Sequence, residues 1–306
     1  MVGSALVKYF LKSGWERDKN LFCYDADFQK RFLDDVAKSK ILFICLPTPT
    51  AKDGSCDTSL VEKAVQKYHD PKRILVVKST VEPGTIAKLQ EKYSSPIIFN
   101  PEFLTEARSW ENFIKPDRQV VAHTIKSRKF TDKILKILPR GKHSFSNLTA
   151  SEAELGKYAS NVFGAMKVAY SNIVADFASA LEKVHAESGI KMSVKYDRLR
   201  HIVGKDPRIG DSWMNVNYQD YRGFGGYCFP KDLNAFINFG AKLARNLNKK
   251  NDQNTKKLVI SGVDFLKSIR AYNDNLLKAQ GLSADLVSRH DKRLKQLLKQ
   301  RRLKNI

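Results

Sequence analysis

The sequence predicts an α/β protein: a Rossmann-like doubly wound parallel sheet without its first strand, followed by a mainly α domain built on one long helix. Two observations predict this class. Short apolar runs of strand composition alternate with helical segments from the start of the chain to about residue 123. The segment from Thr149 to Gly189 then contains no proline and reads as continuous helix.

The first half opens with a helix, MVGSALVKYFLKSG, that ends at Gly14, and a short buried strand, LFCYD, that ends at Asp25. A second strand, KILFICLPTPT, is stopped by Pro47 and Pro49. There follow a helix near 58–68, the strand RILVVKST, the helix VEPGTIAKLQEKY and two more strands, PIIFNPEF and DRQVVAH. Strands separated by helices predict a parallel sheet with helices on both faces.

The second half opens with a capping box, in which Thr149 or Ser151 is the cap and Glu152 and Glu154 stand close behind it. One long helix is predicted from Ser151 to about Ala186. Irregular, glycine-rich sequence follows, and helices fill the remainder.

Composition predicts a reduced, cytoplasmic protein. The longest apolar run, ILFICLP, is far too short to cross a bilayer, and the N-terminus has no secretion signal. The cysteines are too few for a disulfide framework and lack metal-ligand spacing, so we expect no metal. They are Cys23, Cys45, Cys56 and Cys228.

The formal net charge is +22. From Ala241 onward there are 17 Lys or Arg against 5 Asp or Glu, so +12 of the +22 lies in that part. The final stretch RHDKRLKQLLKQRRLKNI is a candidate basic helix, with leucines at Leu294, Leu297, Leu298 and Leu303. A solvated helix with one packed stripe is the favoured interpretation, and contact with nucleic acid or another polyanion is the alternative.

The helix–strand unit at the start resembles half of a dinucleotide site. Asp25 lies 22 residues after Gly3, near the usual spacing of about 20 between a glycine loop and a ribose-binding acid. The first strand and the first two glycines of G-x-G-x-x-G are absent, so Gly3 is at most the last of the three. Alternatively, Asp25 simply ends a strand.

Polar residues follow several predicted strands. Thr48, Ser79 and Thr80 stand just past strand ends, where open α/β sheets bind ligands, although ordinary turns use the same residues. Glu102 and Glu106 are four apart beyond another strand and could orient water or bind sugar hydroxyls. A plain exposed helix start would have the same pattern.

Two features of the second half suggest catalysis. Lys157 and Asn161 are four apart on the long helix, hence on one face, and could stabilise a developing oxyanion, although spacing alone favours a solvent-facing pair. Cys228 lies in GFGGYCFPKD, where the glycines let backbone approach closely. That setting suits a reactive thiol or a tight turn that happens to contain cysteine.

Six motifs carry a family resemblance. ILFICLPTPT…DGSCDTS, VVKSTVEPGT, NPEFLTEA…PDRQVVA, ELGKYASNVFGAMKVAYSN, DPRIG and GFGGYCFPKDLNA occur in the order typical of the UDP-glucose/GDP-mannose dehydrogenase family. The resemblance covers about residues 2 to 240. It implies an N-terminally incomplete NAD-binding domain at 1–148 and a central helical, dimerising, catalytic-cysteine domain at 149–240. A basic helical tail, 241–306, is expected in place of most of a C-terminal UDP-binding domain.

The resemblance also implies an activity: NAD-dependent oxidation of a nucleotide-sugar C6 alcohol to the carboxylate, most of all UDP-glucose to UDP-glucuronate. Cys228 is the implied nucleophile, through a thiohemiacetal and then a thioester. UDP-N-acetylmannosamine and GDP-mannose are alternative substrates. A homodimer through the long helix is implied as well.

The family's functional positions fall on particular residues here. The implied catalytic residues are Cys228, Lys157, Asn161, Asp232, Thr80 and Glu106. The implied cofactor contacts are Gly3, Asp25, Thr48, Thr80, Glu106 and Lys231. The implied substrate contacts are Glu102, Phe103, Leu104, Lys157, Asn161, Arg208 and Gly225.

The sequence departs from the family pattern in three places. It begins inside the cofactor loop, it has basic helical sequence after Gly240, and twenty residues separate Arg208 from Cys228. These departures leave a second hypothesis open: a non-catalytic remnant that binds polyanions or a partner.

Overall fold

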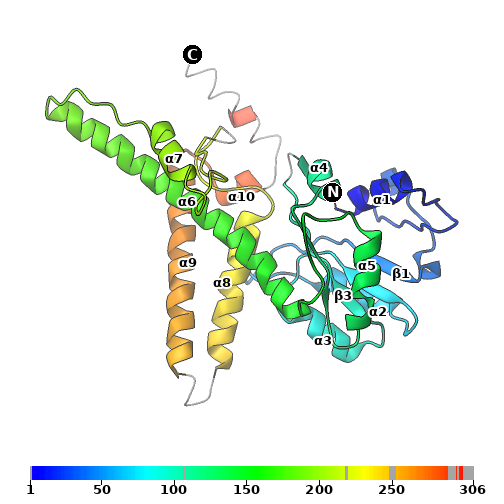
Figure 1. The fold of residues 1–306 in the computed structure, drawn as a ribbon. Helices are drawn as coiled ribbons and strands as arrows, with labels where there is room; N and C mark the ends of the chain where they lie inside the picture. Colours follow the sequence, from blue (N-terminus) through cyan, green and yellow to red (C-terminus); the bar gives the residue numbers. More distant parts are fainter. Residues whose placement is uncertain are drawn as a thin grey trace. The chain divides into compact units, whose positions relative to one another are not determined.

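The computed structural model of the chain describes residues 2–105, 108–217, 220–247, 253–288, 294 and 296–298. It divides into two compact units (Figure 1). The first comprises Met1–Ala51 and Cys56–Lys157, and the second comprises Lys52–Ser55 and Tyr158–Ile306.

The first unit is built on a four-stranded sheet of order β1-β2-β3-β5. Its strands are β1 (Ile41–Ile44), β2 (Ile74–Val77), β3 (Ile97–Phe99) and β5 (Ala122–His123). The pairs β1–β2 and β2–β3 are parallel as predicted, whereas β5 runs antiparallel to β3. The predicted strand DRQVVAH is therefore split: β4 (Arg118–Val120) pairs in parallel with β6 (His143–Phe145) outside this sheet.

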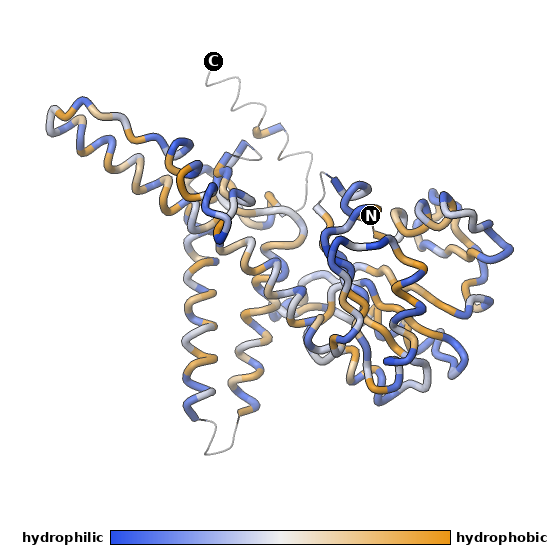
Figure 2. The backbone as a smooth tube through the Cα atoms, in the orientation of Figure 1, coloured by the Kyte–Doolittle hydropathy of each residue, from blue (hydrophilic) through white to orange (hydrophobic). Residues whose placement is uncertain are grey.

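The doubly wound prediction is confirmed, because each face of the sheet packs against its own helices. Ile74 and Val76 of β2 face one core, whereas Leu75 and Val77 face the other. Apolar residues gather along these strands (Figure 2). The first core includes residues of α1 (Val2–Lys12), α4 (Ser109–Ile114) and α5 (Thr131–Ile137), and the second includes residues of α2 (Ser59–Tyr68) and α3 (Thr85–Lys92).

The prediction that LFCYD forms a strand is wrong. Leu21 and Tyr24 form only isolated bridges, with Arg17 and Leu33. A strand requires a continuous ladder with a neighbour, and none is present beside this segment in the described part of the chain. Short 3-10 helices lie elsewhere in the unit, at η1 (Phe28–Lys30), η2 (Val36–Lys38) and η4 (Arg128–Phe130).

The long helix α6 (Ala150–Glu187) confirms the prediction almost residue for residue. Its capping box forms as expected: the N–H of Thr149 donates to the Glu152 carboxylate at 2.7 Å, and the N–H of Glu152 donates to the Thr149 hydroxyl at 3.3 Å. Beyond its end, Gly189 has a φ of 72°, which a glycine adopts without strain.

The second unit is helical. Besides the rest of α6 it contains α7 (Tyr196–Gly204), α8 (Phe229–Asn246), α9 (Gln253–Ala279) and α10 (Ala284–Ser288). Helices α8 and α9 lie side by side (Figure 1), and with α6 they enclose a core around Val162, Leu233 and Val263. Of the candidate basic helix at the end of the chain, Leu294, Leu297 and Leu298 are described and helical, whereas Leu303 lies outside the described residues.

No described helix combines the length and the apolar character that a membrane span requires.

Candidate functional site

In the first unit, polar residues join the carboxyl ends of three neighbouring strands. Ser79, after β2, accepts from the N–H of Leu46 at 2.8 Å and donates to the Leu46 carbonyl at 2.7 Å. The buried ammonium of Lys78 donates to Oδ1 of Asn100, after β3, at 2.6 Å. This edge is therefore held in one arrangement, at the end of the sheet where open α/β folds bind ligands.

Thr48 and Thr80 lie at this edge, as predicted. Thr48 is buried and Thr80 is partly buried. The carbonyl of Thr80 also accepts a weak hydrogen bond from Sγ of Cys56, at 3.6 Å. The backbone there is thus fixed, and the roles of the two hydroxyls stay predictions.

Lys157 is buried in α6 rather than solvent-facing, contrary to what spacing alone favoured. Its side chain is 3% exposed. Its ammonium donates to the Glu102 carbonyl at 2.5 Å and lies 3.5 Å from Oε1 of the same residue. It also lies 5.0 Å from the ring centre of Phe103. Lys157 is thus a desolvated cation fixed against the segment that follows β3.

The segment after β3 carries three predicted substrate contacts. Glu102 bridges two partners: it binds Lys157, and its Oε2 accepts from the N–H of Leu104 at 2.7 Å. Phe103 lies under the guanidinium of Arg118, 3.8 Å from the ring centre. Burial lowers the pKa of Arg118. Glu106, predicted to share a face with Glu102, lies outside the described residues.

In the second unit, three predicted site residues form one hydrogen-bonded group. Asp232 is 1% exposed and lies in the first turn of α8. Its Oδ2 accepts from the side-chain amide of Asn161 at 2.5 Å, and its Oδ1 pairs with the ammonium of Lys231. A buried carboxylate is costly unless it is paired in this way.

Cys228 is the N-cap residue of α8, with Pro230 in the first turn. Its carbonyl accepts from the N–H of Asp232 at 2.8 Å, so cysteine and carboxylate lie on one helical turn. The positive end of a helix dipole favours a thiolate over a thiol. Cys228 is therefore a partly exposed cysteine at a helix N-terminus, a position that favours a nucleophile.

The glycines before Cys228 allow the loop backbone to pack closely against α9 and α10. A Cβ on Gly223 would lie 2.7 Å from Oδ1 of Asn273, and one on Gly225 would lie 2.8 Å from Cγ2 of Val287. Gly223 also has a φ of 101°. For Gly225 this packing is a requirement separate from its predicted substrate contact.

Two amide side chains that the sequence analysis missed hold this loop. Asn273 accepts from the N–H of Phe224 at 2.7 Å and donates to its carbonyl at 3.1 Å. Gln280 does the same for Arg222, at 2.8 and 3.0 Å. Their spacing of two helical turns on one face, within an otherwise apolar stripe, is the signal that could have identified them.

Arg208, a predicted nucleotide-sugar contact, is not joined to these groups by any described hydrogen bond. Its side chain is 86% exposed and pairs with Asp206 two residues before it, at 2.6 Å. An exposed pair of this kind adds little stability, so the guanidinium is available to a ligand.

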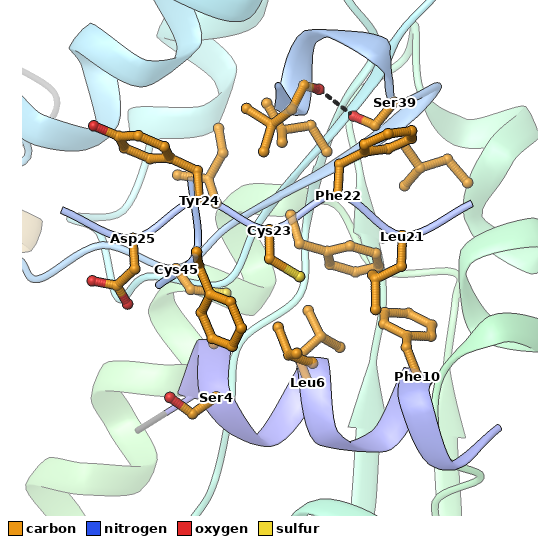
Figure 3. A pocket seen from close by; sticks show the side chains of 18 of the residues that line it. Ser4, Leu6, Phe10, Leu21, Phe22, Cys23, Tyr24, Asp25, Ser39 and Cys45 are labelled. Atoms are coloured by element: carbon orange, nitrogen blue, oxygen red, sulfur yellow. Dashed lines mark hydrogen bonds between the residues drawn. The ribbon is translucent and has the colours of Figure 1, made fainter. Parts of the chain in front are cut away.

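The predicted cofactor residues Gly3 and Asp25 line one cavity of the first unit (Figure 3). Gly3 lies in the first turn of α1, and a Cβ on it would lie 3.5 Å from that of Cys45. The ammonium of Lys30, 2.7 Å away, holds the pKa of the Asp25 carboxyl below its usual range, and the N–H of Asp27 adds to this. An ionised carboxylate suits ribose hydroxyls, and the N-terminus of a helix suits a phosphate. These residues therefore fit part of a dinucleotide.

All four cysteines are free thiols. Burial raises the pKa of Cys23 and of Cys45 to about 11, so both are protonated at neutral pH. Within the described ranges, no three His, Cys, Asp or Glu side chains gather in a way that could hold a metal ion.

Comparison with known proteins gives matches over both units. Residues 18–138 match the UDP-glucose/GDP-mannose dehydrogenase family, NAD binding domain, and residues 151–254 match the central domain of the same family. The UDP-glucose 6-dehydrogenase of Rickettsia felis is 32% identical over 247 residues, or 76% of this chain and 52% of that protein. That of Rickettsia prowazekii is 34% identical over 245 residues, covering 76% and 51%.

Solved structures of dehydrogenases also resemble this chain. A UDP-glucose dehydrogenase from Pyrobaculum islandicum is 31% identical, with a TM-score of 0.61, over 78% of this chain and 51% of that one. A UDP-D-ManNAc dehydrogenase from Pyrococcus horikoshii shares the fold, with a TM-score of 0.63 at 18% identity over 90% of this chain and 66% of that one. The chain spans about half the length of the Rickettsia relatives. With two domains of one family matched in order, the chain belongs to the UDP-glucose/GDP-mannose dehydrogenase family.

Proposed function

We propose that the chain is an NAD-dependent oxidoreductase that converts the C6 alcohol of a nucleotide sugar, UDP-glucose before others, to the carboxylate. The observation that carries the proposal is Cys228 at the start of α8, one turn from the buried group of Asp232 and Asn161. A structural turn would not require a buried carboxylate with two polar partners beside the cysteine.

The proposed chemistry consists of two oxidations and a hydrolysis. NAD, when bound, would accept the hydride that each oxidation removes from C6, and the hydroxyl proton lost with each hydride would pass to a base or to water. After the first, the thiolate of Cys228 adds to the aldehyde carbon, and the oxygen that becomes negative takes up a proton to give a thiohemiacetal. Loss of the second hydride and the hydroxyl proton leaves a thioester. Water then adds to the thioester carbon and the C–S bond breaks, which returns Cys228 as the thiol or thiolate. The carboxylic acid that forms loses its proton and is released as the carboxylate.

The remaining residues have positioning and electrostatic roles in this proposal. Lys157 and Asn161, one turn apart on α6, donate to oxygens that become negative during the addition steps. Asp232 and Thr80 hold or activate water, and Glu106 is the candidate base for thioester hydrolysis. Lys231 contacts the cofactor. Gly3, Asp25 and Thr48 hold its nucleotide half.

Substrate choice rests on relatives at more than 30% identity. Their printed names are UDP-glucose 6-dehydrogenase and UDP-glucose dehydrogenase, which supports UDP-glucose over UDP-N-acetylmannosamine or GDP-mannose. We assign substrate contacts to Glu102, Phe103, Leu104, Arg208 and Gly225. The division at 148 and 240 into cofactor, central and tail regions is part of the same proposal.

We also propose a homodimer through α6 and a cytoplasmic location. Phe163, Tyr170 and Phe177 are each at least 60% exposed and stand seven residues apart, so they form one apolar stripe on the helix. Light scattering of the purified chain would test the dimer, and a monomer at micromolar concentration would contradict it. Four free thiols are usual in a reducing compartment.

The experiment is a turnover assay on the full chain with NAD and, separately, UDP-glucose, UDP-N-acetylmannosamine and GDP-mannose, following absorbance of the reduced cofactor. We expect the highest kcat/KM for UDP-glucose. A preference for another sugar of at least tenfold would reassign the substrate. No turnover with any of the three would favour the non-catalytic hypothesis.

A further inference from the structure

Lys78 is a buried lysine that the proposed chemistry does not use. It directly follows β2 and is 4% exposed. Its ammonium donates to Oδ1 of Asn100 at 2.6 Å and to the Asn100 carbonyl at 3.3 Å. A buried cation held by neutral oxygens costs stability that an apolar side chain of similar size would not cost. A role other than stability is therefore expected for it.

Asn100 joins Lys78 to the neighbouring strands. It is fully buried, and its N–H donates to the carbonyl of Val77 at 2.9 Å. Its side-chain amide donates to Oε1 of Gln119 at 2.9 Å and to the Val120 carbonyl at 2.6 Å. Lys78 supplies the donor for both oxygens of this residue. Every polar group of Asn100 is thus bonded, and the backbone is fixed at the point where it leaves β3.

The fixed backbone leads directly to the acceptor of Lys157. Only Pro101, whose ring restricts φ, separates Asn100 from Glu102. The Glu102 carbonyl accepts from the Lys157 ammonium at 2.5 Å, and its Oε1 lies 3.5 Å from the same nitrogen. Its Oε2 accepts from the N–H of Leu104 at 2.7 Å. The oxygens that hold Lys157 therefore depend on where Asn100 places this segment.

The charges of this group also act on one another. Burial lowers the pKa of Lys78, the Glu102 carboxylate opposes this, and the Lys157 ammonium adds to it. Two buried ammonium groups that repel each other need separate acceptors. The structure supplies them, because Asn100 holds Lys78 and Glu102 holds Lys157. The two lysines are therefore coupled through residues 100–102.

We propose that Lys78 is a positioning residue for Lys157. Through Asn100 it holds the carbonyl and the carboxylate of Glu102 where they orient the Lys157 ammonium. The proposal rests on the proposed function, which gives Lys157 the role of oxyanion donor. Because Lys78 acts through Lys157, its removal should lower kcat and leave the KM for NAD unchanged.

The first test does not require turnover. The full chain, without ligands, is compared as Lys78→Met and as Lys72→Met, which changes an exposed lysine in the turn before β2. Backbone hydrogen exchange is measured for the amide of Leu104, which reports on the Glu102 carboxylate, and for the hydrogen-bonded amide of Ile86 in the same unit. We expect the ratio of the Leu104 rate to the Ile86 rate to rise about tenfold or more in Lys78→Met. Lys72→Met should leave the ratio unchanged.

An unchanged ratio in Lys78→Met would overturn the proposal, because a lysine with a merely structural role affects both amides to the same degree. If Lys78→Met does not fold, Lys78→Gln takes its place, since its amide is uncharged and its side chain is shorter. We then expect the ratio to rise about threefold or more. An unchanged ratio in Lys78→Gln would overturn the proposal equally.

The second test uses turnover with NAD and UDP-glucose in the parent, Lys78→Met, Lys157→Met and the double variant. We expect Lys78→Met to lower kcat about tenfold or more in the parent, but by less than about twofold when Lys157 is already absent. The same loss in both backgrounds would overturn the proposal, since Lys78 would then act independently of Lys157. A parent without turnover would count against the proposed function alone, and the exchange ratio would still decide whether Lys78 positions Glu102.

Discussion

The side-chain amide of Asn161 donates a 2.5 Å hydrogen bond to the carboxylate of Asp232, which joins α6 to the first turn of α8. Asp232 is 1% exposed, and its other oxygen pairs with Lys231. The turn that carries Cys228 is therefore fixed to α6 through a buried carboxylate. The amide of Asn161 thus satisfies one oxygen of this buried carboxylate, and Lys231 satisfies the other.

Asn161→Asp should make stability depend on pH. Two carboxylates in one buried site hold a proton to a higher pH than either does in water, so the folded variant binds protons more tightly than the unfolded chain. Its stability is then lost as the pH rises. We expect it to be about 2–4 kcal/mol less stable than the parent at pH 8 but much closer to it at pH 5. Denaturant unfolding at both pH values would measure this, and an equal deficit at both would contradict it.

Lys157→Met should separate stability from activity. Removing the ammonium leaves the Glu102 carboxylate, whose side chain is 13% exposed, without its cation, at a cost of about 3–5 kcal/mol. The double variant with Glu102→Gln should recover most of that stability. Both variants should lose at least about a hundredfold in kcat, because the oxyanion donor is absent. Recovery of turnover in the double variant would show that Lys157 acts only through folding.

Glu154 should make the parent chain less stable as the pH rises. Its carboxylate is fully buried and accepts from the N–H groups of Gly84 and Ile86 at 2.6 and 2.8 Å. Burial raises its pKa to about 7 from 4.5. The unfolded chain releases this proton near pH 4.5, so stability falls between about pH 4.5 and 7, by roughly 3 kcal/mol at most.

Glu154→Gln removes the titrating group and should flatten this decline. Denaturant unfolding at pH 5 and pH 8 measures the difference for parent and variant. Glu91→Gln, an exposed change on α3, is the control and should leave the decline intact. The prediction is contradicted if the unfolding free energy changes by the same amount between pH 5 and pH 8 in the parent and in Glu154→Gln.

Asn273→Leu should loosen the loop before Cys228. The leucine leaves the buried N–H and carbonyl of Phe224 without partners, which costs about 2–4 kcal/mol. We expect faster alkylation of Cys228 by iodoacetamide, followed by mass spectrometry. Ser268→Ala, an exposed change on the same helix, should leave the rate unchanged. Unchanged alkylation in Asn273→Leu would mean that the loop does not depend on this clamp.

Much of the fold could be predicted from sequence because its signals are local. The capping box at Thr149 and the proline-free run after it define α6, and alternating helices and strands define the doubly wound sheet. The segment LFCYD has the composition of a strand, but a strand depends on a neighbouring ladder that its own sequence does not encode. The antiparallel direction of β5, within the predicted strand DRQVVAH, was not predicted for the same reason.

The candidate site was predicted mainly from the family motifs and less from the spacing and chemistry of its residues. Spacing alone predicted that Lys157 faces solvent. Spacing cannot show that the Glu102 carbonyl, far away in the sequence, accepts a hydrogen bond from its ammonium. Asn273 and Gln280 were missed because their partners are backbone groups some fifty residues earlier. Side chains that bind distant backbone carry no signature of their own in a single sequence.

The most direct test of the account is the product ratio of the purified chain with saturating NAD and UDP-glucose, beside Cys228→Ser. Two hydrides leave each sugar, so we predict two molecules of reduced NAD for every UDP-glucuronate formed. The serine variant should form no uronate, because an ester of serine is not reached from the aldehyde at a useful rate. Uronate formed by Cys228→Ser at the parent's rate, or one reduced NAD per sugar with the aldehyde as the product, would contradict the assignment of Cys228 as the nucleophile.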